Sequence, residues 1–183
     1  GFALNSFSVK AFNFLYYHKH PAGQKEQMVH YDPFFYPLDA IGHWNRIYGK
    51  RGFTQYQFVV PPDQVEGLIK IIETIRAHGM GSFLTVVKLF GPQKENYLRF
   101  PKEGFTLAMD FPLSPKLEGF LSQLDALVLK HGGRVYLTKD LRMPPEMLMA
   151  SYPQAELFRQ KIKELDSTAT FQSLQSQRLD LHL

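Results

Sequence analysis

Polar and hydrophobic residues alternate most clearly over 54–60, TQYQFVV, which the period of two predicts to be a β-strand. In a pleated strand Tyr56 and Phe58 point to one face, and Gln55 and Gln57 point to the other. One face of this strand is therefore expected to lie in a core. The other face is partly polar.

Two later segments repeat the pattern, FLTVVKLF over 83–90 and FTLAMDF over 105–111. If the three strands lie side by side, a single sheet face gathers the polar positions. This face is expected to hold Gln55, Gln57, Lys88, Thr106 and Ala108.

The strands alternate with two helical patterns. The first follows Pro61-Pro62 with Val65, Leu68, Ile69, Ile72 and Ile75 at helical spacing, and the second runs from Leu117 to Val128. A last short strand is predicted over 134–137. The order strand, helix, strand, strand, helix, strand predicts an α+β, ferredoxin-like split βαβ fold, an antiparallel sheet with both helices on one face. Tyr56, Phe58, Leu107 and Met109 are expected to pack under Ile69, Ile72, Phe120 and Leu124.

The flanking segments give weaker patterns. A helix is favoured over 6–17, and a loop over 33–37, because its two prolines interrupt a helix. After the last strand, a helical C-terminal segment is expected, with a helix over 153–165 that turns Leu157, Phe158, Ile162 and Leu165 inward.

Composition narrows the classes of protein. The chain has 183 residues, 44% hydrophobic, enough for one domain with an appendage, and its lack of cysteine excludes disulfides and thiolate catalysis. Its net charge of +4 comes from scattered lysines and arginines, so nucleic acid is not an expected partner. We find no transmembrane segment, signal peptide or metal motif. A cytoplasmic location is expected, with peripheral attachment to a membrane left open.

Catalytic motifs of hydrolases and nucleotide-binding proteins are also absent from the sequence. Glutamines and a lysine on a sheet face suit hydroxyl-rich or anionic ligands, because amides donate and accept hydrogen bonds and lysine adds charge. A polar patch satisfied at a domain interface explains the same pattern. A free-standing RNA-binding module, with Tyr56 and Phe58 as stacking residues, is a further alternative.

Five motifs that follow one another along the chain favour a ligand site over these alternatives. They are FFYPLDAIGHWNRIYG, GFTQYQFVVP, VVKLFGP, a strand that ends in DFP, and GGRVYLTKDLR. Together they resemble the C-terminal, substrate-domain part of the FAD-linked oxidases of the vanillyl-alcohol oxidase superfamily. The resemblance is greatest to the decaprenylphosphoryl-ribose 2-oxidases and their bacterial homologues. It runs from about Phe7 to the C-terminus.

The resemblance implies a division of the chain and a set of site residues. Residues 1–137 would belong to the substrate domain, and residues 138–183 would return to an N-terminal flavin-binding domain that this chain does not contain. Lys139 of YLTKD would lie near FAD and substrate as the catalytic residue. Gln57 and Lys88 would line the substrate pocket, with an apolar wall of Phe35, Leu38 and Trp44. Strand parity adds Gln55, Thr106 and Ala108 of the same sheet face as candidate substrate-binding residues.

The function that follows is oxidation of a hydroxyl group in a sugar or sugar-lipid to a ketone, with hydride transfer to FAD. Two positions depart from the mycobacterial pattern: Ala108 replaces a cysteine, and Thr106 replaces an asparagine. The identity of the substrate is therefore open. An aldonolactone or alditol oxidase is the alternative among enzymes.

Overall fold

The computed structural model describes residues 6–19, 23, 26–36, 39, 42–80, 82, 84–94 and 96–182, without the side chains of residues 6 and 47. The chain divides into two compact units, Gly1–Phe53 and Thr54–Leu183.

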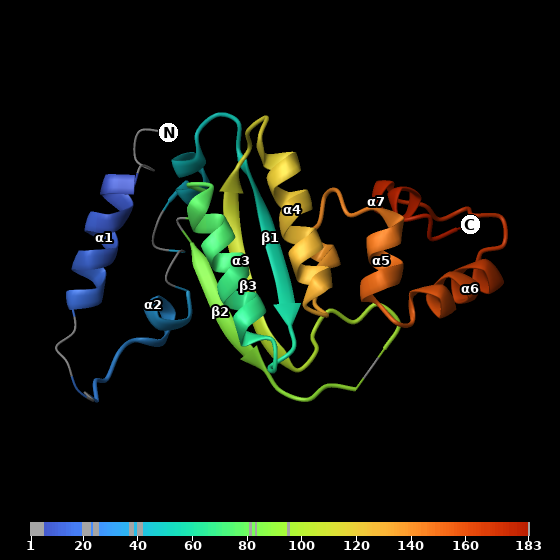
Figure 1. Cartoon of the computed structure of the whole chain (residues 1–183), viewed down its shortest axis with the longest axis horizontal. Coiled ribbons are helices and arrows are strands. Elements are labelled where there is room, and N and C mark those ends of the chain that lie inside the picture. Colours follow the sequence, from blue (N-terminus) through green and yellow to red (C-terminus); the bar gives the residue numbers. More distant parts are fainter. Residues whose placement is uncertain are drawn as a thin grey trace. The chain divides into compact units, whose positions relative to one another are not determined.

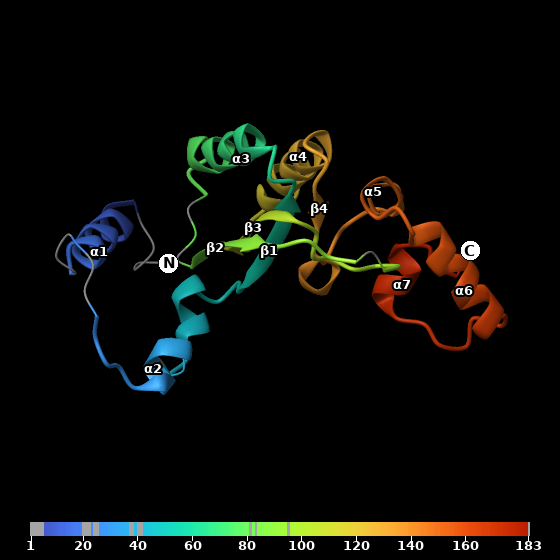
Figure 2. The ribbon, with the colours of Figure 1, turned by 90° about the horizontal axis from the view of Figure 1, so that it is seen from below.

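The second unit holds the predicted sheet. Its elements follow in the order β1 (Phe53–Val60), α3 (Val65–Ala77), β2 (Thr85–Phe90), β3 (Gly104–Pro112), α4 (Leu117–Lys130) and β4 (Arg134–Val135). The strands are arranged as an antiparallel sheet in the order β2-β3-β1-β4, and α3 and α4 cover the same face (Figures 1 and 2). The α+β, ferredoxin-like prediction is confirmed.

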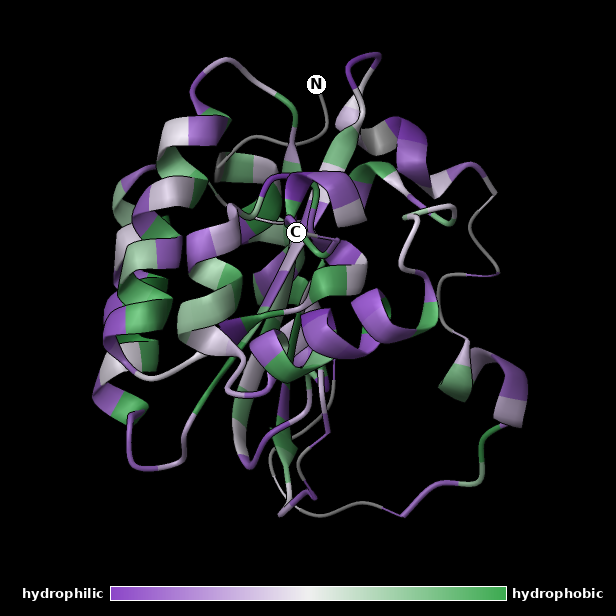
Figure 3. Cartoon of the chain, turned by 90° about the vertical axis from the view of Figure 1, so that its right-hand side faces the viewer, coloured by the Kyte–Doolittle hydropathy of each residue, from purple (hydrophilic) through white to green (hydrophobic). Residues whose placement is uncertain are grey.

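Strand parity places the core between this sheet and its two helices. Tyr56, Phe58, Leu107 and Met109 are all buried in it, together with Phe120 and Leu124 of α4. Because Tyr56 and Phe58 are buried, they cannot be the stacking residues that the RNA-binding alternative requires. Hydrophobic and hydrophilic residues follow one another in bands along the helices (Figure 3).

The predicted inward face of α3 is wrong at two positions. Leu68, Ile71 and Ile75 are buried, whereas Ile69 and Ile72 are 49% and 43% exposed. At 100° per residue, Ile69 and Ile72 lie on the flank opposite Gly67, whose Cα lies against the His131 ring at the end of α4. Contact with α4 therefore turns these two isoleucines away from the core.

The edge strand β2 also exposes apolar side chains on the face of the sheet that α3 and α4 cover. Val87 and Leu89 lie opposite Leu107 and Phe105 of β3, which puts them on the helix face. They remain 55% and 65% exposed, although Leu107 is buried. Apolar side chains of α3 and β2 are thus open to solvent along this side.

Beyond β4 the chain is helical, as predicted. It forms η2 (Leu137–Lys139), α5 (Pro145–Ser151), α6 (Ala155–Leu165) and α7 (Leu174–Arg178). Met147 and Leu148 of α5 and Leu179 and Leu181 after α7 are buried in the core. The inward assignment of Leu157 and Leu165 is wrong, because they are 45% and 87% exposed, whereas Phe158 and Ile162 pack against the core.

The first unit contains α1 (Ser6–His18), α2 (Tyr31–Phe35) and the 3-10 helix η1 (Trp44–Tyr48). The predicted helix over 6–17 is confirmed. The predicted loop over 33–37 is wrong for its first three residues, because Pro33 lies in the first turn of α2, where a missing N–H breaks no helical hydrogen bond. Within the described ranges, no helix is both long and apolar enough to cross a membrane.

Candidate functional site

A row of polar residues crosses the sheet on the face that α3 and α4 leave free. Lys88 of β2 lies directly opposite Thr106 of β3, so both side chains point to the same face. Gln57 of β1 donates from Nε2 to Thr106 Oγ1 over 3.1 Å. Tyr136, the residue after β4, donates its backbone N–H to the Gln57 carbonyl over 2.8 Å, which joins β1 to the chain beyond the last strand. Parity predicted this grouping of Gln57, Lys88 and Thr106.

A second polar pair lies beside this row. Gln55 donates from Nε2 to Asp110 Oδ1 over 2.8 Å, and Asp110 is 1% exposed. The Asp110 backbone N–H donates to Ser82 Oγ over 2.9 Å. Ala108 lies between Thr106 and Asp110 on the same face. The amide donor of Gln55 therefore serves the buried carboxylate, which leaves its Oε1 as the acceptor for a ligand hydroxyl.

Three aromatic rings border the row on its other side. Phe100 stacks on Tyr136 with ring centroids 4.4 Å apart, and Phe90 meets Phe100 edge-on at 6.1 Å. The sequence reading missed these rings, although Phe90 has the parity of Lys88 and Tyr136 begins the YLTK motif. Phe100 is buried in contact with the other two rings, so Phe90 and Tyr136, both half-buried, are the rings of this group that could meet the apolar face of a sugar.

Lys139 lies at a cavity near the first residues of β1. Because β4 ends after two residues, this part of β1 lacks a neighbour on that side, and a cavity of about 230 Å³ opens there. Its lining includes Gln55, Tyr56, Leu117, Lys139 and Arg142. Among the described residues, the Lys139 amine makes no hydrogen bond or ion pair. The fold thus brings Lys139 and Gln55, which are 84 positions apart, to one cavity.

A buried polar network forms the inner wall of the cavity. Tyr56 donates its hydroxyl to Asp125 Oδ1 over 2.8 Å, and Arg142 binds the other oxygen of the same carboxylate. Glu118 lies 3.5 Å from the Arg142 guanidinium. Burial raises the pKa of Asp125 despite the adjacent Arg142, and burial next to Asp125 raises the pKa of Tyr56 well above its ordinary value.

The predicted apolar wall belongs to the first unit. Phe35 is 67% exposed and meets Phe34 edge-on, with ring centroids 5.0 Å apart. Trp44 packs against Tyr48 and Phe53 at 6.4 and 5.4 Å. Leu38 lies outside the described residues. The assignment of Phe35, Leu38 and Trp44 to the substrate pocket therefore stays a prediction.

Comparison with known proteins confirms the resemblance that the motifs predicted. The chain is 39% identical over 177 residues to decaprenylphosphoryl-beta-D-ribose oxidase of Mycolicibacterium smegmatis, a match that covers 97% of this chain and 38% of that protein. It is 30% identical over 131 residues to an uncharacterized protein in the mprA 5' region of Streptomyces coelicolor, covering 71% of this chain and 36% of the relative. The chain thus spans less than two fifths of either relative. No family model matches it.

Proposed function

We propose that this chain is the substrate-binding part of an FAD-dependent oxidoreductase that oxidises a hydroxyl of a sugar or sugar-lipid to a ketone. The observation that carries the proposal is the pairing of the oxidase similarity with the polar row Gln57, Thr106 and Lys88. The relative's name gives a lipid-linked ribose as its substrate. The aldonolactone or alditol oxidases remain the alternative within this chemistry.

The polar sheet face supplies both hydrogen-bond acceptors and a hydrogen-bond donor, and the hydroxyl groups of a polyol can bind to both. Gln57 uses Nε2 to bind Thr106, so its Oε1 can accept a hydrogen bond from a substrate hydroxyl. Lys88 is exposed and has no partner in the described part of the chain, so its ammonium can donate to a hydroxyl or to a phosphate oxygen. Gln55 adds a second acceptor through Oε1.

Lys139 is the proposed catalytic residue. Lys139 lines the same cavity as Gln55, where its amine could bind the hydroxyl oxygen or take the hydroxyl proton. When the carbon that bears this hydroxyl loses a hydride, the oxygen must lose its proton for a ketone to form. Lys139 and Gln55, which line the same cavity, would hold the alcohol in the orientation that this loss requires.

The residues at the cavity fit one edge of a flavin. FAD, when bound, would accept the hydride and its two electrons. Within the described part of the chain the Lys139 amine has no hydrogen-bond or ion-pair partner, and strand alternation turns the Gln55 backbone groups towards the edge that Gln57 presents to Tyr136. We assign the rest of the cofactor site to a flavin-binding domain outside this chain.

Substitution of Lys139 tests the proposal. In the full-length polypeptide, Lys139→Ala should slow anaerobic flavin reduction by decaprenylphosphoryl-beta-D-ribose at least about a hundredfold, the usual scale of general acid–base catalysis, while bound FAD is retained. Stopped-flow absorbance measures the reduction rate. Lys130→Ala, at the end of α4, is the control. A rate within about threefold of the unaltered protein, under 1 kcal/mol, would limit Lys139 to a structural contact.

A further inference from the structure

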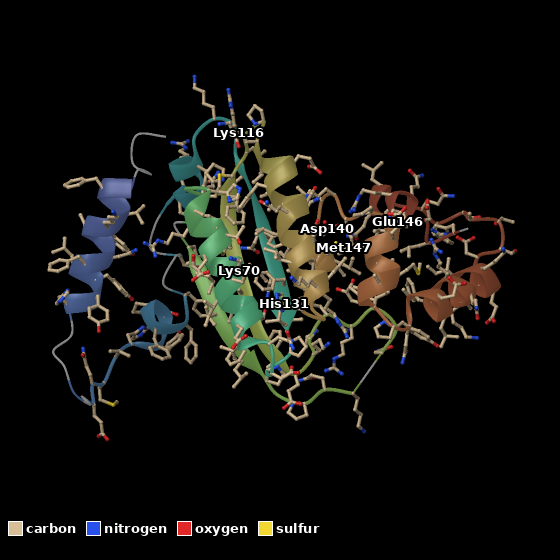
Figure 4. The ribbon with its side chains drawn as sticks, in the orientation of Figure 1. Lys70, Lys116, His131, Asp140, Glu146 and Met147 are labelled. Carbon is tan, nitrogen blue, oxygen red and sulfur yellow. The ribbon has the colours of Figure 1, made fainter. Side chains whose placement is uncertain are left out.

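The segment that carries Lys139 has little regular structure of its own. Lys139 ends the single 3-10 turn η2, and the connection from there to α5 forms no strand or helix of its own. Figure 4 shows Asp140 on this connection. Something else must fix its backbone, because the position of an amine depends on the chain beneath it.

On one side of Lys139, the contact comes from α7. Gln175 donates from Nε2 to the backbone carbonyl of Leu137 over 2.7 Å. Gln175 and Leu137 are 38 residues apart in the sequence, and this bond ties η2 to the C-terminal helix.

On the other side of Lys139, α7 makes two more contacts through Arg178. Its Nη2 lies 2.9 Å from Asp140 Oδ2, and its Nη1 donates to the carbonyl of Met143. Asp140 Oδ1 accepts the backbone N–H groups of Arg142 and Met143, at 3.0 and 2.8 Å. The carboxylate therefore folds the connection into a turn, and Arg178 holds that turn.

The helix that makes these contacts is itself anchored. Leu179 and Leu181, just beyond α7, are 0% and 7% exposed in the core. A capping box of Ser173 and Ser176 orders its N-terminus. Such a short helix is not stable alone, so its position is set by these contacts.

We propose that α7 is the positioning element for Lys139, with Gln175 and Arg178 as positioning residues that fix the backbone on either side of it. The kinetic part of this inference rests on the proposed function, and the structural part does not. Because both residues bind backbone or a backbone-binding carboxylate, neither needs to touch the substrate.

The chain offers a matched pair of substitutions for the test. Gln175→Met removes the amide that binds Leu137. Gln177→Met makes the same change on the same helix and is the control. The Gln177 side chain is exposed, and among the described residues its amide binds only Gln172, over 2.8 Å. Arg178→Met removes the second contact. Gln175→Asn keeps the amide and Arg178→Lys keeps the positive charge, and both serve where a methionine variant does not fold.

Two measurements on the full-length, FAD-loaded polypeptide separate the outcomes. The first is the rate at which acetic anhydride labels the Lys139 amine, followed by mass spectrometry, which requires no substrate. In Gln175→Met and Arg178→Met, this labelling rate should differ about threefold from that of the unaltered protein, because loss of either contact lets the segment open. The second is flavin reduction by decaprenylphosphoryl-beta-D-ribose, which should slow about tenfold at saturating substrate with bound FAD unchanged. Gln177→Met should change neither.

The result pattern decides between the positioning role and the proposed function. Altered labelling with normal flavin reduction supports positioning and removes Lys139 from the chemistry. Unaltered labelling in the folded variants, whatever the reduction rate, overturns the role of α7. Partial recovery of both rates in Arg178→Lys, relative to Arg178→Met, would further support it.

Discussion

At the scale of single residues, polar side chains in this chain are paired across elements. Gln55 binds Asp110, Gln57 binds Thr106, and Tyr56 binds Asp125, each between β1 and another element. Removal of the Gln57 amide, for example, would take this hydrogen bond from the buried Thr106 hydroxyl, which costs about 1–3 kcal/mol. These pairs also decide which atoms remain available to a ligand.

Tyr56→Phe should lower stability at neutral pH and make it less sensitive to alkali. Burial raises the pKa values of both Tyr56 and Tyr152, so each phenol stays neutral in the folded chain above pH 10, where an unfolded tyrosine ionises. The stability linked to each phenol is therefore present below about pH 10 and is lost above it, by about 1.4 kcal/mol per pH unit. Tyr56→Phe removes one of these two contributions.

Urea unfolding of the chain between pH 7 and pH 12, followed by far-UV circular dichroism, measures the effect. The double variant Tyr56→Phe/Tyr152→Phe is the control, and its stability should fall least steeply above pH 10. Parallel curves for Tyr56→Phe and the unaltered chain would contradict a buried neutral phenol at this position.

At the scale of elements, the strands were predictable because their alternation is strong and each side chain has only two faces to choose from. Helix α3 shows the limit of such patterns. Its Leu68, Ile69 and Ile72 are equally apolar, and only the contact of Gly67 with His131 decides which of them is buried. Likewise, the prolines around α2 predicted a loop, although a proline in the first turn is compatible with a helix.

The candidate site was likewise predictable only where strand alternation determines it. Parity brought Gln57, Lys88 and Thr106 together, because the register of adjacent strands determines which residues share a face. No local pattern indicates that Asp110 takes the amide of Gln55, or that Arg178 reaches Asp140. These contacts join distant parts of the chain through single side chains.

Gly104→Ala should disrupt the junction of β1 and β3. Gly104 has φ of 142°, and a Cβ atom there would lie 2.0 Å from the Val60 carbonyl oxygen. The oxygen belongs to a buried backbone and cannot move aside, so the substitution should cost roughly 3 kcal/mol or more. Urea unfolding measures the loss. Gly91→Ala is the control, since a Cβ atom at Gly91 meets nothing within 4 Å. Equal stability of the two variants would contradict the close approach.

At the scale of the whole molecule, one side of the sheet unit exposes apolar side chains to solvent. Ile69 and Ile72 of α3 and Val87 and Leu89 of β2 are exposed along an edge strand, and unpaired apolar edges promote association. The relatives are more than twice as long as the part that matches this chain. We expect a part of the longer polypeptide to bury this side.

Leu89→Lys tests that expectation in the full-length polypeptide. If Leu89 is buried there, a lysine at this position would be desolvated and should lower the melting temperature by several degrees. Leu165→Lys, at a position 87% exposed, is the control. Equal melting temperatures would show that β2 faces solvent. A concentration-dependent melting temperature would instead indicate that a second copy covers the edge.

The 183-residue chain alone should not retain FAD. Its residues would supply one edge of the cofactor site, whereas the chain spans only 38% of the oxidase that it resembles. A dinucleotide needs several backbone donors for its pyrophosphate, usually at a helix N-terminus after a glycine-rich turn, and no such motif occurs in this sequence. Gel filtration of the chain with excess FAD, followed by a visible spectrum, measures retention against the full-length polypeptide as control. A stoichiometric flavin band in the chain's own peak would place the whole cofactor site within these residues. In that case the proposal that Lys139 and Gln55 form one edge of a site completed by another domain would be wrong. A complete FAD site requires more groups than one amine and one strand edge, so the two residues would need a different role.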